Sequence, residues 1–166
     1  MTKPSDELLK RAYAQDASIY QETPQDVAFP ASAEEVVALV KSGKSLIPRA
    51  AGTSLAGQVV GDGTVLDTGR HMNAMLHINV EERWAEVQPG VVRDELNHYL
   101  KEYGLFFGPN TSTSNRSMMG GMVGNNSSGS TSISYGTTRE KLLGLELVTA
   151  DGVLRAMGDI QSDGMR

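Results

Sequence analysis

Cysteine is absent from the 166-residue chain, which excludes disulfide bonds, cysteine-ligated zinc and cysteine-ligated iron–sulfur clusters within it. Histidine is scarce, and His71, His77 and His98 do not stand at metal-ligand spacing from one another or from a carboxylate, so no metal site is expected. No apolar run approaches the roughly 20 residues that a membrane-spanning helix needs. The N-terminus mixes acidic and basic residues and is not typical of a signal peptide. We therefore expect a cytoplasmic protein without a membrane span.

Positive charge is also lacking, because the formal net charge is −5 at pH 7. Nonspecific binding to nucleic acid depends on basic stripes that neutralise phosphates, so no nucleic-acid partner is expected. The content of 39% hydrophobic and 21% charged residues is typical of a globular domain, and the length allows a buried core. Glycine, in contrast, is abundant, with 18 residues.

The N-terminal half shows two helical patterns and the first strands. Residues 1–25 form a predicted helical extension, with Ser5 as the N-cap of its helix. The range from Val27 to Arg49 reads as a β-α-β unit with a parallel pair of strands. Its helix is marked by a capping box between Ser32 and Glu35.

Further along, alternating residues predict short strands, and a stripe of apolar residues predicts another helix. This helix runs through residues 92–103 and ends before Gly104. The pair Asp151-Gly152 lies between two alternating segments and indicates a type I′ hairpin turn. Other strands are expected at residues 65–67, 76–80 and 83–88, the last two joined by a hairpin through Glu81 and Glu82.

A loop of small residues, "PRAAGTSLAGQ" from Pro48 to Gln58, directly follows a predicted strand. Small residues allow backbone N–H groups to converge into a concavity that binds an anion. Gly52 and Gly57 have the spacing of a nucleotide P-loop, but Gln58-Val59 replace its lysine and hydroxyl residue, and the dinucleotide fingerprint GxGxxG is missing. The alternative is a tight surface loop with no ligand.

A second stretch of small polar residues runs from Asn115 to Glu140 and contains the pair Gly120-Gly121. A flexible linker is the simple alternative. Apolar residues within the stretch, such as Met118 and Ile133, favour a packed loop around a large, partly apolar ligand. Together the two stretches indicate a ligand with a diphosphate and a flat ring system. The nearest cations are Arg49, Arg116 and Arg139.

The order of several segments along the chain is more specific than any single segment. The segments are "ASAEEVVALV", "IPRAAGTSLAGQ", "VQPGVVRDELNHYLKEYGLFFGPNTSTSN", "MMGGMVGNNSSG" and "YGTTREKLLGLELVTADG". Over residues 26–157 this order resembles the FAD-binding domain of the vanillyl-alcohol-oxidase (PCMH) type. It is most similar to the FAD-linked 2-hydroxy-acid dehydrogenases, the group of glycolate oxidase, D-lactate dehydrogenase and D-2-hydroxyglutarate dehydrogenase.

The resemblance implies an α+β fold of two α+β subdomains with FAD between them. Residues 26–90 would form the first subdomain and residues 91–166 the start of the second, which would be incomplete. FAD would be bound non-covalently, because the first loop contains neither histidine nor cysteine. The pyrophosphate would be held by the backbone of Ala50, Ala51, Gly52, Thr53 and Ser54; the flavin and the rest of the cofactor by Pro109, Ser117, Gly120, Gly121, Asn125, Asn126 and Gly129; and the adenine end by Val148.

Two departures from the family pattern matter. Ala50 and Ala51 stand where the family has glycines, so the loop must use ordinary backbone dihedrals or bind less tightly. The family's cap domain, which binds and deprotonates the 2-hydroxy acid, would lie in a missing C-terminal part, in some relatives together with an iron–sulfur domain. We therefore expect no catalytic residue here, no activity of the fragment alone and weak or no FAD binding. An exposed edge at Val153 to Met157 would allow a homodimer.

Three alternatives stay open at this point. The chain could be a binding module for another nucleotide, which would respond to ADP or ATP and not to FAD. It could come from a flavin reductase of the same fold that acts in cell-wall precursor synthesis. It could also be a ligand-free structural remnant.

Overall fold

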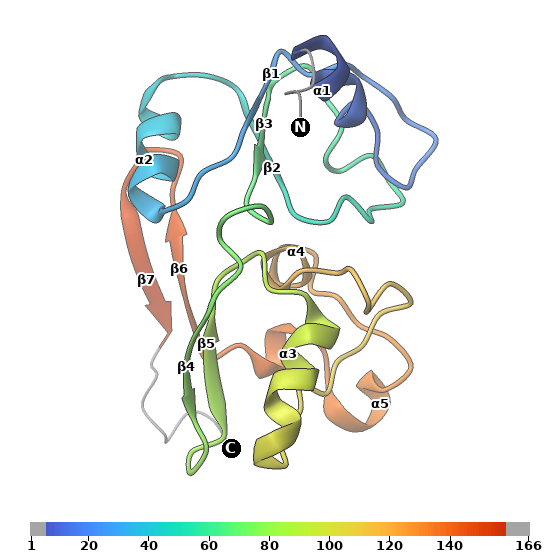
Figure 1. The fold of residues 1–166 in the computed structure, drawn as a ribbon, viewed down its shortest axis with the longest axis vertical. Helices are drawn as coiled ribbons and strands as arrows, with labels where there is room; N and C mark the ends of the chain where they lie inside the picture. Colours follow the sequence, from blue (N-terminus) through green and yellow to red (C-terminus); the bar gives the residue numbers. More distant parts are fainter. Residues whose placement is uncertain (1–5, 159–166) are drawn as a thin grey trace, which may run out of the picture.

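The structure is a computed structural model that describes residues 6–158. The expected N-cap Ser5 lies outside the described residues. Helices and strands are mixed in an α+β arrangement, with a three-stranded parallel sheet and two antiparallel hairpins. Figure 1 shows the parallel sheet with the N-terminal helix in the upper half, and the β4–β5 hairpin with three short helices in the lower half.

The parallel sheet contains β1 (Asp26–Ala28), β2 (Leu46–Arg49) and β3 (Thr64–Asp67), in the order β1-β3-β2. The predicted β-α-β unit is confirmed, since β1 and β2 run parallel in one sheet, but the two strands are not neighbours, because β3 lies between them and pairs with both. Val65 and Leu66 are buried, and such an apolar strand is stable only in the middle of the sheet.

Two helices accompany this sheet. Helix α1 (Asp6–Ala12) precedes it, and α2 (Ala33–Lys41) connects β1 to β2. The expected cap of α2 is present, since the Ser32 hydroxyl accepts a hydrogen bond from Glu35 N at 3.4 Å. The Glu35 carboxylate reaches back to Ala31 N at 2.8 Å. Local chemistry therefore fixes where α2 begins.

A second hydrophobic cluster joins the β4–β5 hairpin to the helices that follow it. It contains Val91, Leu96, Leu100, Met119 and Met122, packed against partly buried side chains of the hairpin. The elements are β4 (Met75–Asn79), β5 (Trp84–Val87), α3 (Arg93–Leu100), η1 (Lys101–Tyr103) and α4 (Met119–Gly124). The predicted subdomain limits remain a prediction, and the hairpin that they assign to the first subdomain shares this cluster with α3 and α4.

The two hairpin turns differ from each other. The β4–β5 turn passes through Glu81 and Glu82 as expected, with Arg83 at φ +61°. The C-terminal hairpin joins β6 (Gly144–Val148) to β7 (Leu154–Gly158) and runs beside α2 (Figure 1). Its predicted type I′ turn is wrong, because that turn needs positive φ at both central residues and only Gly152 has it.

Side-chain hydrogen bonds explain the longer connection of the C-terminal hairpin. The Asp151 carboxylate accepts hydrogen bonds from the Thr149 hydroxyl, from Val153 N at 3.3 Å and from Arg155 at 3.1 Å. These bonds keep Asp151 at negative φ and leave the positive φ to Gly152 alone.

The glycine-rich stretch from 115 to 140 is more regular than expected. Besides α4 it contains α5 (Ser132–Tyr135) and η2 (Arg139–Lys141). The predicted packed loop is therefore partly helical, and the prediction of a loop is wrong over α4, α5 and η2. Met119 and Met122, three residues apart, are both buried, and their burial outweighs the poor helix propensity of the glycines between them. None of the helices in residues 6–158 is long and apolar enough to cross a membrane.

Candidate cofactor site

The first loop begins where β2 ends, at the carboxyl edge of the parallel sheet. The ends of β2 and β3 are adjacent there, since Thr68 N donates to Arg49 O at 3.2 Å. Ligands of parallel sheets bind outside this edge. The amide N–H groups of residues 50–55 donate no hydrogen bond to any residue between 6 and 158. Residues 50–54 are half-buried, so their unpaired donors suit an anion such as a diphosphate.

The loop keeps its shape through its own side chains and one glycine. The Ser54 hydroxyl accepts hydrogen bonds from Ala56 N and Gln58 N, both at 3.2 Å, and contacts Gln58 Oε1 at 2.9 Å. Gly52 has φ +66°, whereas Ala50 and Ala51 have ordinary negative φ. Of the two expected outcomes, ordinary dihedrals or less tight binding, the first is present here, and the N–H groups of both alanines donate to no described residue.

The second stretch meets the first loop at the same edge of the sheet. A Cβ atom on Gly121, in α4, would lie 3.0 Å from Ala50 Cβ. A Cβ atom on Gly69, just after β3, would lie 2.6 Å from the Met118 side chain. The structure thus brings together two of the sequence-predicted residues, Ala50 and Gly121, although they are far apart in the chain.

Other predicted residues pack next to the contact between Ala50 and Gly121. Pro109 and Ser117 are buried. Arg93, which sequence reasoning did not single out, ties them together: its Nε donates to Pro109 O at 3.2 Å, and its backbone N donates to Ser117 O at 2.9 Å. A Cβ atom on Gly120 would lie 2.6 Å from Pro89 Cβ.

The remaining predicted residues lie further along the stretch. Asn126 has φ +47°, and its side-chain oxygen accepts from Arg139 N at 2.9 Å. Asn125 is exposed and contacts Ser127 at 3.4 Å. A Cβ atom on Gly129 would lie 2.1 Å from Asn110 O. Val148 pairs with Leu154 in the C-terminal hairpin. The cofactor contacts of these residues stay predictions.

Among the three expected cations, Arg49 is the one beside the loop. A Cβ atom on Gly52 would lie 2.4 Å from Arg49 Nη2. The guanidinium is also held by the N-terminal segment, because Nη1 donates to Gln15 O at 2.9 Å. Arg116 is exposed and contacts Asn115 at 3.0 Å. Arg139 is exposed as well.

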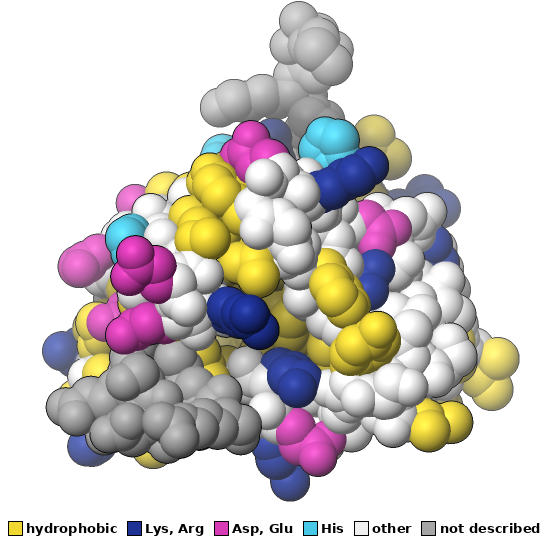
Figure 2. All heavy atoms as spheres, turned by 90° about the horizontal axis from the view of Figure 1, so that it is seen from below, with side chains coloured by type: hydrophobic (Ala, Val, Ile, Leu, Met, Phe, Trp, Pro, Cys, Tyr) yellow, Lys and Arg dark blue, Asp and Glu magenta, His cyan; other side chains and the backbone are white. Residues whose placement is uncertain are grey.

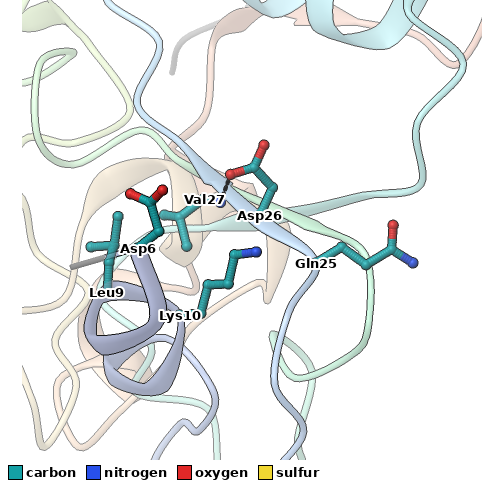
Figure 3. A pocket seen from close by; sticks show the side chains of 6 residues that line it. All are labelled: Asp6, Leu9, Lys10, Gln25, Asp26 and Val27. Carbon is teal, nitrogen blue, oxygen red and sulfur yellow. Dashed lines mark hydrogen bonds between the residues drawn. The ribbon is translucent and has the colours of Figure 1, made fainter.

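One hollow lies away from this edge. It measures about 200 Å³ and lies between α1 and the start of β1. Figure 3 shows Lys10 of α1 pointing towards Gln25 and Asp26, and the hydrogen bond from Val27 N to the Asp26 carboxylate measures 2.9 Å. This is the amino end of β1, so the hollow is separate from the loop after β2.

Comparison with known proteins agrees with this geometry. The FAD binding domain family matches residues 24–158. The chain is 44% identical over 155 residues to D-2-hydroxyglutarate dehydrogenase of Pseudomonas putida, covering 89% of this chain and 15% of that protein. It is 33% identical over 158 residues to glycolate oxidase subunit GlcD of Bacillus subtilis, covering 91% and 34%. A solved structure of alkyldihydroxyacetonephosphate synthase has a TM-score of 0.71 at 27% identity, covering 80% of this chain and 28% of that chain.

The chain therefore spans only 15% to 34% of the length of these two curated relatives. The family match covers most of the chain, and the free amides and close glycine contacts at the sheet edge fit a dinucleotide. This chain belongs to the FAD binding domain family, with the PCMH-type fold and FAD as its cofactor.

Proposed function

We propose that this chain is the FAD-binding part of a flavin-dependent oxidoreductase that oxidises a 2-hydroxy acid, such as D-lactate, glycolate or D-2-hydroxyglutarate, to the 2-oxo acid. The observation that carries the proposal is the row of unpaired amides at residues 50–55, with Gly121 packed against Ala50. The names of the relatives support the substrate class, because glycolate, D-lactate and D-2-hydroxyglutarate are all 2-hydroxy acids.

In this proposal the backbone does most of the binding. The N–H groups of Ala50 to Ser54 hold the diphosphate, which explains how an acidic chain binds an anion. Because Gly120 and Gly121 have no side chains, α4 packs closely against Pro89 and Ala50, which places its backbone beside the loop. The flavin and the rest of the cofactor contact Pro109, Ser117, Asn125, Asn126 and Gly129, with Val148 at the adenine end.

The bound flavin supplies the acceptor for the hydride that leaves the α-carbon of the hydroxy acid. We assign no catalytic residue to this chain. The hydroxyl proton and the substrate carboxylate are handled by a cap domain, for which the greater length of the relatives leaves room. An iron–sulfur domain, a homodimer through β7 and a cytoplasmic location are further parts of the proposal.

The structure refines the expectation of weak or no FAD binding. Ala50 and Gly121 meet within the described residues, and this contact supports a site to which both small-residue stretches contribute. We therefore propose that the chain binds FAD reversibly and without a covalent bond. Turnover of D-lactate or another 2-hydroxy acid by this chain alone, with an artificial acceptor, is not expected.

A panel of ligands tests the cofactor part of the proposal. The melting temperature of the chain is measured with FAD, FMN, ADP and ATP at equal concentrations, because a ligand that binds only the folded state raises it. FAD should raise it most, and FMN, which lacks the adenylate, should raise it less. A rise with ADP or ATP and none with FAD would instead indicate a module for another nucleotide.

The substrate part needs a longer form of the protein that includes the region beyond this chain. With a dye as acceptor, it should oxidise one or more of D-lactate, glycolate and D-2-hydroxyglutarate. Failure with every 2-hydroxy acid, in a protein that retains FAD, would refute the proposed substrate class and leave the cofactor assignment intact.

A further inference from the structure

The segment from Tyr13 to Glu22 precedes the family match, which begins at residue 24. It nevertheless packs against the first loop of the cofactor site. We propose that this segment is a positioning element, which holds the loop Ala50–Gln58 in its phosphate-binding shape through Arg49 and Tyr20. This inference rests on the proposed function, since it assigns a task within the same site.

The first connection runs through Arg49. Its guanidinium donates to Gln15 O at 2.9 Å, and its Cζ lies 5.2 Å from the centre of the Tyr13 ring. The same guanidinium fills the space where a side chain of Gly52 would stand. One side chain therefore contacts both the N-terminal segment and the middle of the loop, so a shift of the segment must move the loop as well.

The second connection ties the segment to the central strand. The Tyr13 hydroxyl donates to Asp67 Oδ2 at 2.5 Å, and Asp67 is the last residue of β3. Burial, together with this hydrogen bond, raises the pKa of Tyr13 well above its usual value, so the hydroxyl remains a donor even in alkaline solution. The segment is thereby fixed to the same sheet edge from which the loop emerges.

The third connection is apolar and lies at the far end of the loop. A Cβ atom on Gly57 would lie 2.7 Å from Tyr20 Cδ2, so the tyrosine ring rests directly on the Gly57 backbone. Gly57 has φ +71°, a conformation that glycine adopts without strain. Tyr20 and Gly57 also line one shallow hollow of about 280 Å³.

The segment has a defined shape of its own. Glu22 N donates to Ala14 O at 2.8 Å, and Gln15 and Gln21 form an antiparallel bridge. Ala14 is 1% exposed and anchors the turn. A closed turn with a buried anchor can transmit position to the loop, whereas a loose tail could not.

Asp16, also in this segment, is held in its charged form mainly by hydrogen bonds. Burial opposes the ionisation of Asp16, but hydrogen bonds from Ser18, with smaller effects of Ser54 and Arg49, outweigh it and lower the pKa of Asp16. Asp16 is therefore an anion close to the phosphate-binding loop. Arg49 contributes a smaller part of this lowering and supplies a positive charge beside the loop.

The test uses the whole chain labelled with ¹⁵N, and compares Tyr20→Ala and Tyr13→Phe with the unaltered protein. Backbone order parameters of residues 50–58 and the dissociation constant of FAD are measured. Both variants should lower the order parameters from the rigid value of about 0.85 towards 0.6 or below, and raise the dissociation constant about tenfold. Tyr13→Phe removes only one oxygen atom and is the second variant if Tyr20→Ala does not fold.

Two controls separate positioning from general damage. Tyr103→Ala makes the same chemical change on η1, where Tyr103 packs against Tyr99 with ring centres 5.8 Å apart, and should leave loop order and FAD affinity unchanged. Tyr20→Phe keeps the ring on Gly57 and should restore both to the unaltered values.

Unchanged order parameters and an unchanged dissociation constant in Tyr20→Ala and Tyr13→Phe would overturn the inference. If the unaltered chain does not bind FAD while the variants still lose loop order, the positioning by the segment holds and the proposed cofactor site fails. The two failures can therefore be distinguished.

Discussion

Gly129 is the glycine at which an added methyl group should destabilise the fold most. A Cβ atom there would lie 2.1 Å from the carbonyl oxygen of Asn110, and backbone cannot move aside as a flexible side chain can. We expect Gly129→Ala to lower the free energy of unfolding by about 2 kcal/mol, measured by urea denaturation.

Gly124→Ala is the matched control. A Cβ atom on Gly124 would have no neighbour within 4 Å, and Gly124 lies in α4, where alanine is the better helix former. Its stability should be unchanged or slightly raised. Equal losses in both variants would show that the close approach of Gly129 to Asn110 is not a feature of the folded protein.

At the scale of elements, the start of α3 should respond to acid. The Asp94 carboxylate accepts hydrogen bonds from Arg93 at 2.9 Å and from the Ser114 hydroxyl at 3.0 Å. The hydrogen bond from Arg93, more than any other contact, lowers the pKa of Asp94. A lowered pKa in the folded state means that this stabilisation is complete above the unfolded value of about 4 and is lost as the pH falls below it.

Asp94→Asn removes this titration. Urea denaturation between about pH 3 and pH 6 should show that the variant loses less stability on acidification than the unaltered chain. Identical pH slopes for the two proteins would mean that the contacts of Asp94 do not contribute to folding.

Local signals explain which elements the sequence could predict. The Ser32 cap and Gly104, at φ +67°, mark the ends of α2 and of the α3–η1 helix, and both were correctly expected. The central place of β3 and the helical turn of α4 depend on packing against distant residues, so no short window of sequence reveals them. The turn at Asp151 was misread because hydrogen bonds to its carboxylate override the dipeptide preference.

The candidate site was also predictable only in part from the sequence. Its two small-residue segments were found from composition and from the order of motifs, and the structure brings Ala50 and Gly121 together. The parts played by Tyr13 and Tyr20 were missed, because they stand before the motifs and their spacing carries no signal. Arg49 was noticed only as a nearby cation, since its contact with Gln15 is visible only in the fold.

The molecule as a whole leaves apolar surface open to solvent. Figure 2 shows hydrophobic side chains among charged ones on the face seen from below. Ile133 is 95% and Leu55 81% exposed. All residues of β7 are exposed, and within residues 6–158 this strand pairs with β6 alone. An open strand edge of this kind can pair with another chain.

Self-association through β7 can be tested by sedimentation velocity over a range of concentrations. The unaltered chain should show a sedimentation coefficient that rises with concentration. Met157→Lys places a charge on the edge strand, where Met157 is 51% exposed, and should abolish the rise. Ile133→Lys adds the same charge on α5 and should behave as the unaltered chain. A rise that persists in Met157→Lys, or that Ile133→Lys removes equally, would speak against β7 as the contact.

The central claim is that backbone amides of the first loop bind the diphosphate of FAD. The most direct measurement is a titration of the ¹⁵N-labelled chain with FAD, followed through the amide chemical shifts of residues 50–54. These shifts should move progressively and saturate together with those of Gly120 and Gly121. Saturable FAD binding that leaves the amides of residues 50–54 unshifted would contradict the account, and so would the absence of any saturable change.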